Sequence, residues 1–276
     1  MYMAASAAWN SSCLSRQVGA VLTDFQGEIL SVGWNDVPVY GGGLYHHNKE
    51  KRDEKIYGLF YNPKYKDERC FNLRFCANDQ QKNIMSKKIV EALDKENLLN
   101  TKISDYKKTA EDKIRKSKIS SLVEFSRSIH AEMHAIISGC ITSGQRVKNG
   151  KLYITTYPCH ICARHIILAG IKEVYFIEPY RKSLTITLDG DSITDDEDLK
   201  VEDVHKVIIR QFEGVGPNRY MQLFKMLPES RKQKLTGQLF ENQDGFEKTT
   251  PKYSISLTAI PTIESQITST LLEKLK

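Results

Sequence analysis

Two short stretches of the sequence carry side chains that bind transition metals. The first is His130-Ala131-Glu132, and the second is Pro158-Cys159-His160-Ile161-Cys162. An imidazole and two thiolates suit zinc, and a catalytic zinc takes three protein ligands and leaves a fourth position for water. His130, Cys159 and Cys162 fill these three places. Glu132 is then left to carry protons.

The spacing of the two cysteines predicts how they lie. If a helix starts at Pro158, Cys159 and Cys162 share one side of its first turn, because residues three apart are neighbours on a helix. Proline suits such a start, since its missing N–H would have had no partner. His130 stands at the head of another helix-forming run, residues 131–140. We therefore expect two helix N-termini to meet over one zinc ion, where their amide groups favour the thiolate form of cysteine.

Two other kinds of zinc site use similar residues. A pair of cysteines with this spacing is often half of a structural site with four protein ligands. The added His130 and Glu132, at a separation that leaves room for one strand, favour a catalytic site instead. The metalloprotease motif pairs histidines four apart, as His130 and His134 are, but it needs a glutamate directly after the first histidine. Ala131 stands there, so that motif is absent.

Together the two motifs resemble those of the zinc-dependent cytidine and deoxycytidylate deaminase superfamily. Residues 12–21 and 33–38 resemble the deoxycytidylate branch, and residues 178–183 and 212–220 resemble the deaminase half of bacterial anti-phage dCTP deaminases. The resemblance covers about residues 1–225. Those dCTP deaminases usually carry a P-loop, kinase-like domain in front. This sequence has no Gly-x-x-x-x-Gly-Lys-Ser/Thr run, so we expect that half to be missing.

The resemblance implies roles for residues outside the zinc motifs. Asn35 is expected to contact the sugar or base of a nucleotide, although a turn residue beside Asp36 would look the same. Three further residues are candidates for holding phosphate: Arg16 and Lys182 by positive charge and resemblance, and Ser183 by resemblance.

A second, structural zinc is implied by the match at Cys13 to phage deoxycytidylate deaminases. Its remaining ligands would come from Cys70 and Cys76, with His46 or His47. Buried free thiols are the alternative for these cysteines.

Composition places the chain among globular proteins without a membrane span. It has 276 residues, 40% of them hydrophobic, which is enough for one large domain with a buried core. No apolar run approaches the ~18 residues that a bilayer span needs. The start of the chain lacks the basic and apolar pattern of a secretion signal, so the six cysteines indicate thiols or metal ligands and a cytoplasmic location.

Apolar patterning predicts a three-layer α/β/α fold of the cytidine deaminase type, with a mixed five-stranded sheet. Helices are expected at residues 2–12, 131–140 and 158–169, and a helical segment is expected between the last two strands. The strands are expected at residues 18–22, 29–34, 151–156, 174–178 and 207–212.

Two segments fall outside this core pattern. Residues 40–124 are longer and more polar than the core requires and are predicted to be an insertion, with one or two exposed helices within residues 84–123. Residues 82–118 contain eleven basic and six acidic side chains, which we interpret as a solvated face. The domain is expected to end near residue 225. Residues 226–276 are predicted to be a tail with a final helix at 263–275.

The predicted function is deamination of a free deoxycytidine nucleotide, dCMP or dCTP, by a zinc-dependent homo-oligomer, with a role in anti-phage nucleotide depletion. One alternative is a deaminase acting on tRNA or single-stranded nucleic acid, with the lysine-rich segment as a phosphate track. Few aromatic residues interleave with these lysines, which argues against nucleic acid. Another alternative is a non-catalytic, zinc-stabilised interaction protein, but Glu132 would then be unexplained.

Overall fold

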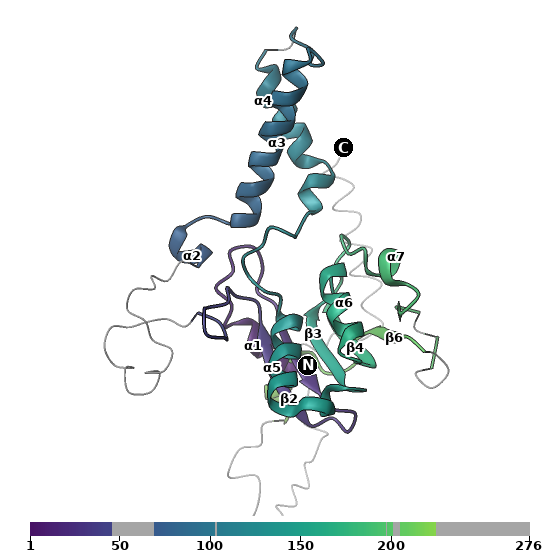
Figure 1. The fold of residues 1–276 in the computed structure, drawn as a ribbon. Helices are drawn as coiled ribbons and strands as arrows, with labels where there is room; N and C mark the ends of the chain where they lie inside the picture. Colours follow the sequence, from purple (N-terminus) through teal and green to yellow (C-terminus); the bar gives the residue numbers. More distant parts are fainter. Residues whose placement is uncertain (46–68, 103, 197, 201–204, 225–276) are drawn as a thin grey trace, which may run out of the picture. The chain divides into compact units, whose positions relative to one another are not determined.

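The computed structural model describes residues 1–45, 69–102, 104–196, 198–200 and 205–224 (Figure 1). Contacts within the chain divide it into two units, residues 1–223 and 224–276. Nearly all of the second unit lies outside the described residues, and so does the helix predicted at 263–275. The predicted division of the chain into domain, insertion and tail stays a prediction.

A mixed sheet forms the centre of the first unit. Its strand order is β2-β1-β3-β4-β6-β5. Strand β1 lies antiparallel to both of its neighbours, whereas β3, β4, β6 and β5 run parallel to one another. The strands are β1 (Gly19–Thr23), β2 (Ile29–Trp34), β3 (Lys151–Thr156), β4 (Glu173–Glu178), β5 (Ile193–Thr194) and β6 (Val207–Gln211).

The register of β1 and β2 places helices on opposite faces of the sheet. Gly19 pairs with Trp34, and Ala20 pairs with Gly33, so Gly19 and Gly33 face opposite sides. A Cβ atom on Gly19 would lie 1.9 Å from the carbonyl oxygen of Ala4 in α1 (Tyr2–Ala8). On Gly33 it would lie 2.3 Å from the carbonyl oxygen of Ala131 in α5 (Ala131–Ser143). The two glycines thus let α1 and α5 pack directly on the two faces.

The predicted three-layer α/β/α architecture is therefore confirmed, and the main core lies between the sheet and its helices. Leu22, Leu152, Ile154 and Val174 of the sheet are fully buried. They belong to one cluster with Ala135 of α5 and with Ile166 of α6 (His160–Leu168). Burial of this continuous apolar surface is the main force that holds α5 and α6, the two helices that begin within the predicted metal motifs, on the sheet.

The sheet has six strands where the sequence predicted five. The additional strand is β5, which pairs with β6 at one edge of the sheet. Only its Ile193 is fully buried. A two-residue strand with one buried side chain has no periodicity that a sequence pattern can reveal. Strand β5 follows α7 (Thr185–Asp189) in the chain.

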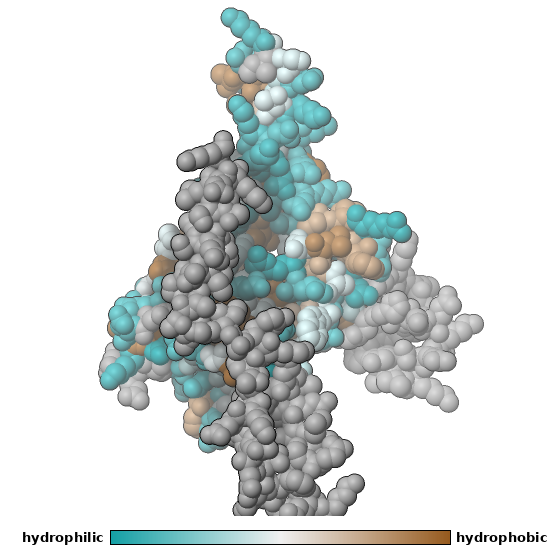
Figure 2. Space-filling model, turned by 180° about the vertical axis from the view of Figure 1, so that it is seen from behind, coloured by the Kyte–Doolittle hydropathy of each residue, from teal (hydrophilic) through white to brown (hydrophobic). Residues whose placement is uncertain are grey.

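The predicted insertion is largely helical where the structure describes it. It comprises α2 (Cys70–Leu73), α3 (Ala77–Lys95), α4 (Tyr106–Lys116) and the 3-10 helix η1 (Lys118–Ser121). Helices α3 and α4 run side by side (Figure 1). Polar contacts join them: Asp94 accepts a hydrogen bond from Tyr106 and pairs with Lys107, and Arg115 pairs with Asp79. Their surface is largely hydrophilic (Figure 2).

The remaining described elements are short. The 3-10 helix η2 (Gly144–Val147) follows α5, and α8 (Pro217–Phe224) follows β6. Stacking of the Tyr2 and Tyr220 rings places the start of α8 beside α1. Within the described residues, no helix has both the length and the apolar character that crossing a bilayer would require.

Candidate functional site

His130, Cys159 and Cys162 come together as the sequence predicted. The Nδ1 atom of His130 lies 3.2 Å from the sulfur of each cysteine, and the three ligand atoms all lie within 4.8 Å of one another. Within the described residues this is the one cluster of metal-binding type. Usual Zn–N and Zn–S bond lengths at tetrahedral angles give N···S separations of about 3.5 Å. The donor set and its spacing therefore fit zinc.

Two helix N-termini present these ligands. His130 is the N-cap of α5 and Cys159 is the N-cap of α6, both with extended backbone, and Cys162 lies in the first turn of α6. The predicted start of the second helix at Pro158 is two residues too early. The carbonyl oxygen of Pro158 accepts hydrogen bonds from the hydroxyls of Ser183 and Thr185, and is therefore not used by the helix.

Two features of β2 and the residues after it fix His130 in place. The absent side chain of Gly33 lets the N-terminus of α5 lie against the strand. Beyond the strand, the N–H of Ile129 donates to the carbonyl oxygen of Asp36 over 2.9 Å. The Asp36 carboxylate in turn accepts hydrogen bonds from Ser12 and pairs with Arg69 at 3.6 Å. The chain that leads into His130 is therefore anchored to the β2 edge of the sheet.

The pKa values of the three clustered side chains also indicate a site for a cation. A hydrogen bond from Cys162, together with nearby His130, lowers the pKa of Cys159 to about 4. Burial raises the pKa of Cys162 well above its usual range. Burial alone would lower the pKa of His130, but its hydrogen bond with Cys159 and the charge of Glu132 raise it to about 9. The cluster thus shares protons that a bound zinc ion would displace.

Glu132 lies beside this cluster and is 4% exposed. Burial raises the pKa of its carboxyl group to about 6, and the neighbouring His130 limits the rise. It is not one of the three clustered ligands. It lies in the first turn of α5, next to Cys162.

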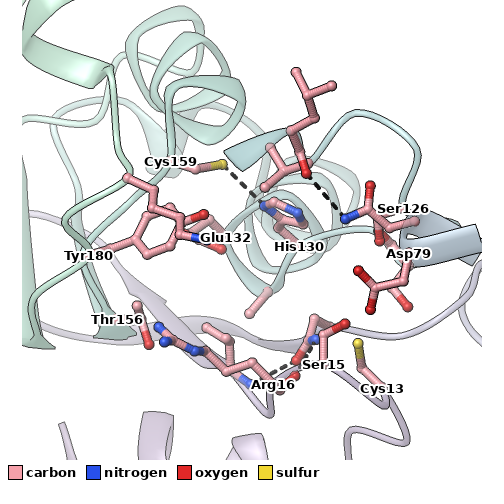
Figure 3. A pocket seen from close by; sticks show the side chains of 18 of the residues that line it. Cys13, Ser15, Arg16, Asp79, Ser126, His130, Glu132, Thr156, Cys159 and Tyr180 are labelled. Carbon is pink, nitrogen blue, oxygen red and sulfur yellow. Dashed lines mark hydrogen bonds between the residues drawn. The ribbon is translucent and has the colours of Figure 1, made fainter. Parts of the chain in front are cut away.

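A pocket of about 380 Å³ opens onto the cluster. Figure 3 shows the Cys13 to Arg16 segment across the pocket from His130 and Cys159. Tyr180 and Thr156 lie towards one end, and Asp79 and Ser126 towards the other. The volume falls within the range of small-molecule sites.

Asn35 lines this pocket, but both ends of its amide contact the backbone. Its Oδ1 accepts a hydrogen bond from the N–H of Val18 at 2.7 Å, and its Nδ2 donates to the carbonyl oxygen of Arg16 at 2.8 Å. Asn35 is 6% exposed. It therefore shapes the pocket wall that carries Arg16, and a direct contact with substrate stays a prediction.

The three predicted phosphate-binding residues differ in where they lie. Arg16 lines the pocket and stacks over Tyr180, with its guanidinium carbon 5.7 Å from the ring centre. Lys182 lines the pocket too, and its amine donates to the carbonyl oxygen of Ser120. The Ser183 hydroxyl instead joins Pro158 to Thr185 and is not part of the pocket lining.

The residues predicted to hold a second zinc are only partly described. His46 and His47 lie outside the described residues. Cys13 lines the pocket, Cys76 lies 3.4 Å from the Ser15 hydroxyl, and Cys70 is buried. These three cysteines do not form a three-ligand cluster with one another or with other described residues. The second zinc stays a prediction.

Sequence reasoning missed the part of the pocket that the insertion supplies. Asn78, Asp79 and Lys82 of α3 line it. The interpretation of the lysine-rich run as a solvated face is wrong for Lys82, which is 5% exposed. One lysine among many carries no local sign of burial, so no sequence pattern could have singled it out.

Curated relatives match short parts of the chain around the motifs. "ComE operon protein 2" of Bacillus subtilis is 46% identical over 56 residues, which is 20% of this chain and 29% of that protein. Human deoxycytidylate deaminase is 36% identical over 72 residues, 26% of this chain and 35% of the human protein. The matches thus span about a third of these relatives.

A solved structure and a family model match more of the chain. The structure of dCMP deaminase from cyanophage S-TIM5 in complex with dCMP and dUMP is 20% identical, with a TM-score of 0.38, over 76% of this chain and 93% of that one. The model of the cytidine and deoxycytidylate deaminase zinc-binding region matches residues 1–178, which include both metal motifs. The chain therefore belongs to the zinc-binding cytidine and deoxycytidylate deaminase family, with His130, Cys159 and Cys162 as its candidate zinc site.

Proposed function

We propose that the protein hydrolyses the exocyclic amine of a free deoxycytidine nucleotide, dCMP or dCTP, to give the matching uracil nucleotide and ammonia. One observation carries the proposal. His130 and Cys159 of the candidate zinc site and the buried carboxyl group of Glu132 line the same pocket as the basic side chains of Arg16 and Lys182. A site for hydrolysis thus adjoins a site for an anion.

The chemistry divides between the metal and Glu132. Zinc, when bound, makes a water molecule acidic enough to ionise near neutral pH. Glu132 accepts one proton of that water and passes it to N3 of the cytosine ring as the hydroxide adds to C4. It then takes the proton of the new C4 hydroxyl and gives it to the exocyclic amine, which leaves as ammonia while C4 becomes a carbonyl. Burial of Glu132 keeps bulk water from competing for these protons.

The basic residues favour a nucleotide over a nucleoside. Hydrogen bonds between cationic side chains and phosphate are stronger than neutral ones. The names of the human and phage relatives, deoxycytidylate deaminases, support dCMP. The sequence resemblance of residues 178–183 and 212–220 to anti-phage dCTP deaminases supports dCTP, and with it a role in nucleotide depletion during phage infection.

The test is a substrate panel with the zinc-loaded protein. Deoxycytidine, dCMP, dCTP and a cytosine-containing single-stranded oligonucleotide are supplied at equal concentration, and ammonia and uracil product are both quantified. We expect kcat/KM for dCMP or dCTP to exceed that for deoxycytidine at least tenfold. Equal turnover of deoxycytidine, or turnover of the oligonucleotide alone, would show the proposal to be wrong. Glu132→Gln is the control for contaminating deaminases.

A further inference from the structure

Lys82 is a buried cation in a segment of otherwise solvated lysines. It lies on α3 and is 5% exposed, whereas Lys87 and Lys88 on the same helix are exposed. Its amine donates to the carbonyl oxygen of Ser120 over 3.2 Å. An ammonium group has three N–H donors, so one carbonyl oxygen leaves donors for another acceptor.

Lys182 reaches the same oxygen atom from the core of the fold. It lies between β4 and α7, and its amine donates to the Ser120 carbonyl over 3.3 Å. Two ammonium groups from segments far apart in the sequence therefore flank one neutral oxygen. Burial lowers the pKa of Lys82, the nearby Asp79 carboxylate raises it, and the positive charges of Arg115 and Lys182 lower it again. An anion placed between the two amines would relieve this repulsion.

Asp79 compensates the positive charge of Lys82 only in part. Asp79, one helical turn before Lys82, also lines the pocket, but its carboxylate pairs with Arg115 at 2.6 Å. Within the described residues, neither Lys82 nor Lys182 forms an ion pair of its own. Arg16 adds a third positive charge to the pocket lining.

We infer that Lys82 is a specificity-determining residue, which together with Lys182 binds the phosphate of the nucleotide. The insertion then supplies part of the active site. This inference rests on the proposed function, because both lysines line the pocket that contains His130 and Glu132. In this arrangement we expect the base to lie at Glu132 and the phosphate at this pair of amines.

A purely structural role makes a different prediction. Lys82 also ties α3 to η1 through Ser120, so its loss could loosen the pocket. Loosening would slow turnover of nucleotide and nucleoside alike. Loss of a phosphate contact lowers kcat/KM for the nucleotide alone. The ratio of the two kcat/KM values therefore separates the roles.

The experiment compares Lys82→Met with Lys88→Met, which removes an exposed lysine from the same helix. Each zinc-loaded protein is assayed with deoxycytidine and with dCMP and dCTP. We expect the nucleotide-to-nucleoside ratio to fall about 10- to 100-fold in Lys82→Met, the usual effect of one charge-assisted hydrogen bond. Lys82→Arg, which keeps the charge, should recover much of the ratio, and Lys88→Met should keep the wild-type ratio.

A second variant covers the case in which the first one is unstable. If Lys82→Met does not fold, Lys82→Gln replaces it, because its amide still donates a hydrogen bond without the charge. An unchanged ratio in the folded variant, while the wild type prefers nucleotides, overturns the inference and leaves the proposed function intact.

If the wild type deaminates no cytosine nucleotide, the proposed function fails and calorimetry with inorganic pyrophosphate tests the anion site directly. Binding at least tenfold weaker in Lys82→Met than in Lys88→Met would support the site. Equal binding would overturn it.

Discussion

The side-chain amide of Asn35 donates a hydrogen bond to the carbonyl oxygen of Arg16 over 2.8 Å. The same amide accepts a hydrogen bond from the N–H of Val18. Asn35, which follows β2, thereby holds the backbone of residues 16–18 against the pocket. Through this contact it positions the backbone of Arg16, and we expect it to affect substrate binding without touching the substrate.

Asn35→Asp tests this positioning role. The substitution keeps the shape but places a carboxylate oxygen against the Arg16 carbonyl, so a buried acceptor loses its donor at a cost of about 1–3 kcal/mol. We expect the free energy of unfolding to fall by that amount and KM for the nucleotide to rise. Denaturant titration and steady-state kinetics measure the two effects. Asn218→Asp, at an exposed position, is the matched control and should change stability by less than about 0.5 kcal/mol.

Cys159→Ala should remove zinc and activity together. The variant leaves two ligands where a catalytic zinc needs three. Metal analysis of the purified protein, with any second zinc counted separately, should show a loss of about one zinc per chain. Cys140→Ala, which changes an exposed cysteine, should retain it. Full zinc content in Cys159→Ala would mean that the metal binds elsewhere.

Glu132→Gln should separate metal binding from proton transfer. The amide has nearly the same size but cannot accept and return a proton, so kcat should fall at least about 100-fold. Zinc content and thermal stability should stay close to those of the wild type, because Glu132 is not among the clustered ligands. Activity within a few-fold of wild type would assign the proton transfer to another group.

Gly33→Ala should weaken zinc binding by displacing the helix that carries His130. The new Cβ would lie 2.3 Å from the carbonyl oxygen of Ala131, so the N-terminus of α5 must move and take His130 with it. We expect the free energy of unfolding to fall by about 1–3 kcal/mol. Zinc binding, measured by competition with a chelator, should become weaker. In Gly216→Ala the added atom meets nothing within 4 Å, and zinc affinity should be unchanged. Equal zinc affinity in the two variants would contradict the role of Gly33.

Lys182→Ala should change nucleotide binding, whereas Ser183→Ala, at the adjacent residue, should change stability. Lys182 lines the pocket, so its loss should raise KM for the nucleotide far more than KM for deoxycytidine. The Ser183 hydroxyl holds Pro158 and Thr185, so its loss should lower stability by about 1 kcal/mol and leave the nucleotide preference in place. A large rise in KM for the nucleotide in Ser183→Ala would show that Ser183 does contribute to phosphate binding.

The amino-acid sequence by itself determined the metal cluster and most of the sheet. The ligands His130, Cys159 and Cys162 stand at two helix starts, where local spacing and backbone amides fix their geometry. Five of the six strands are apolar runs long enough to show a pattern. The sixth, β5, is two residues long, and only its parallel pairing with β6 makes it a strand.

Tertiary structure alone decided which polar residues line the pocket. Lys82 and Ser183 have ordinary surface chemistry in the sequence, yet one is buried in the pocket wall and the other joins two loops. Their partners, the carbonyl oxygens of Ser120 and Pro158, are backbone atoms that every residue carries. A contact with a distant backbone oxygen leaves no mark in residue types or spacing, so only the folded chain reveals it.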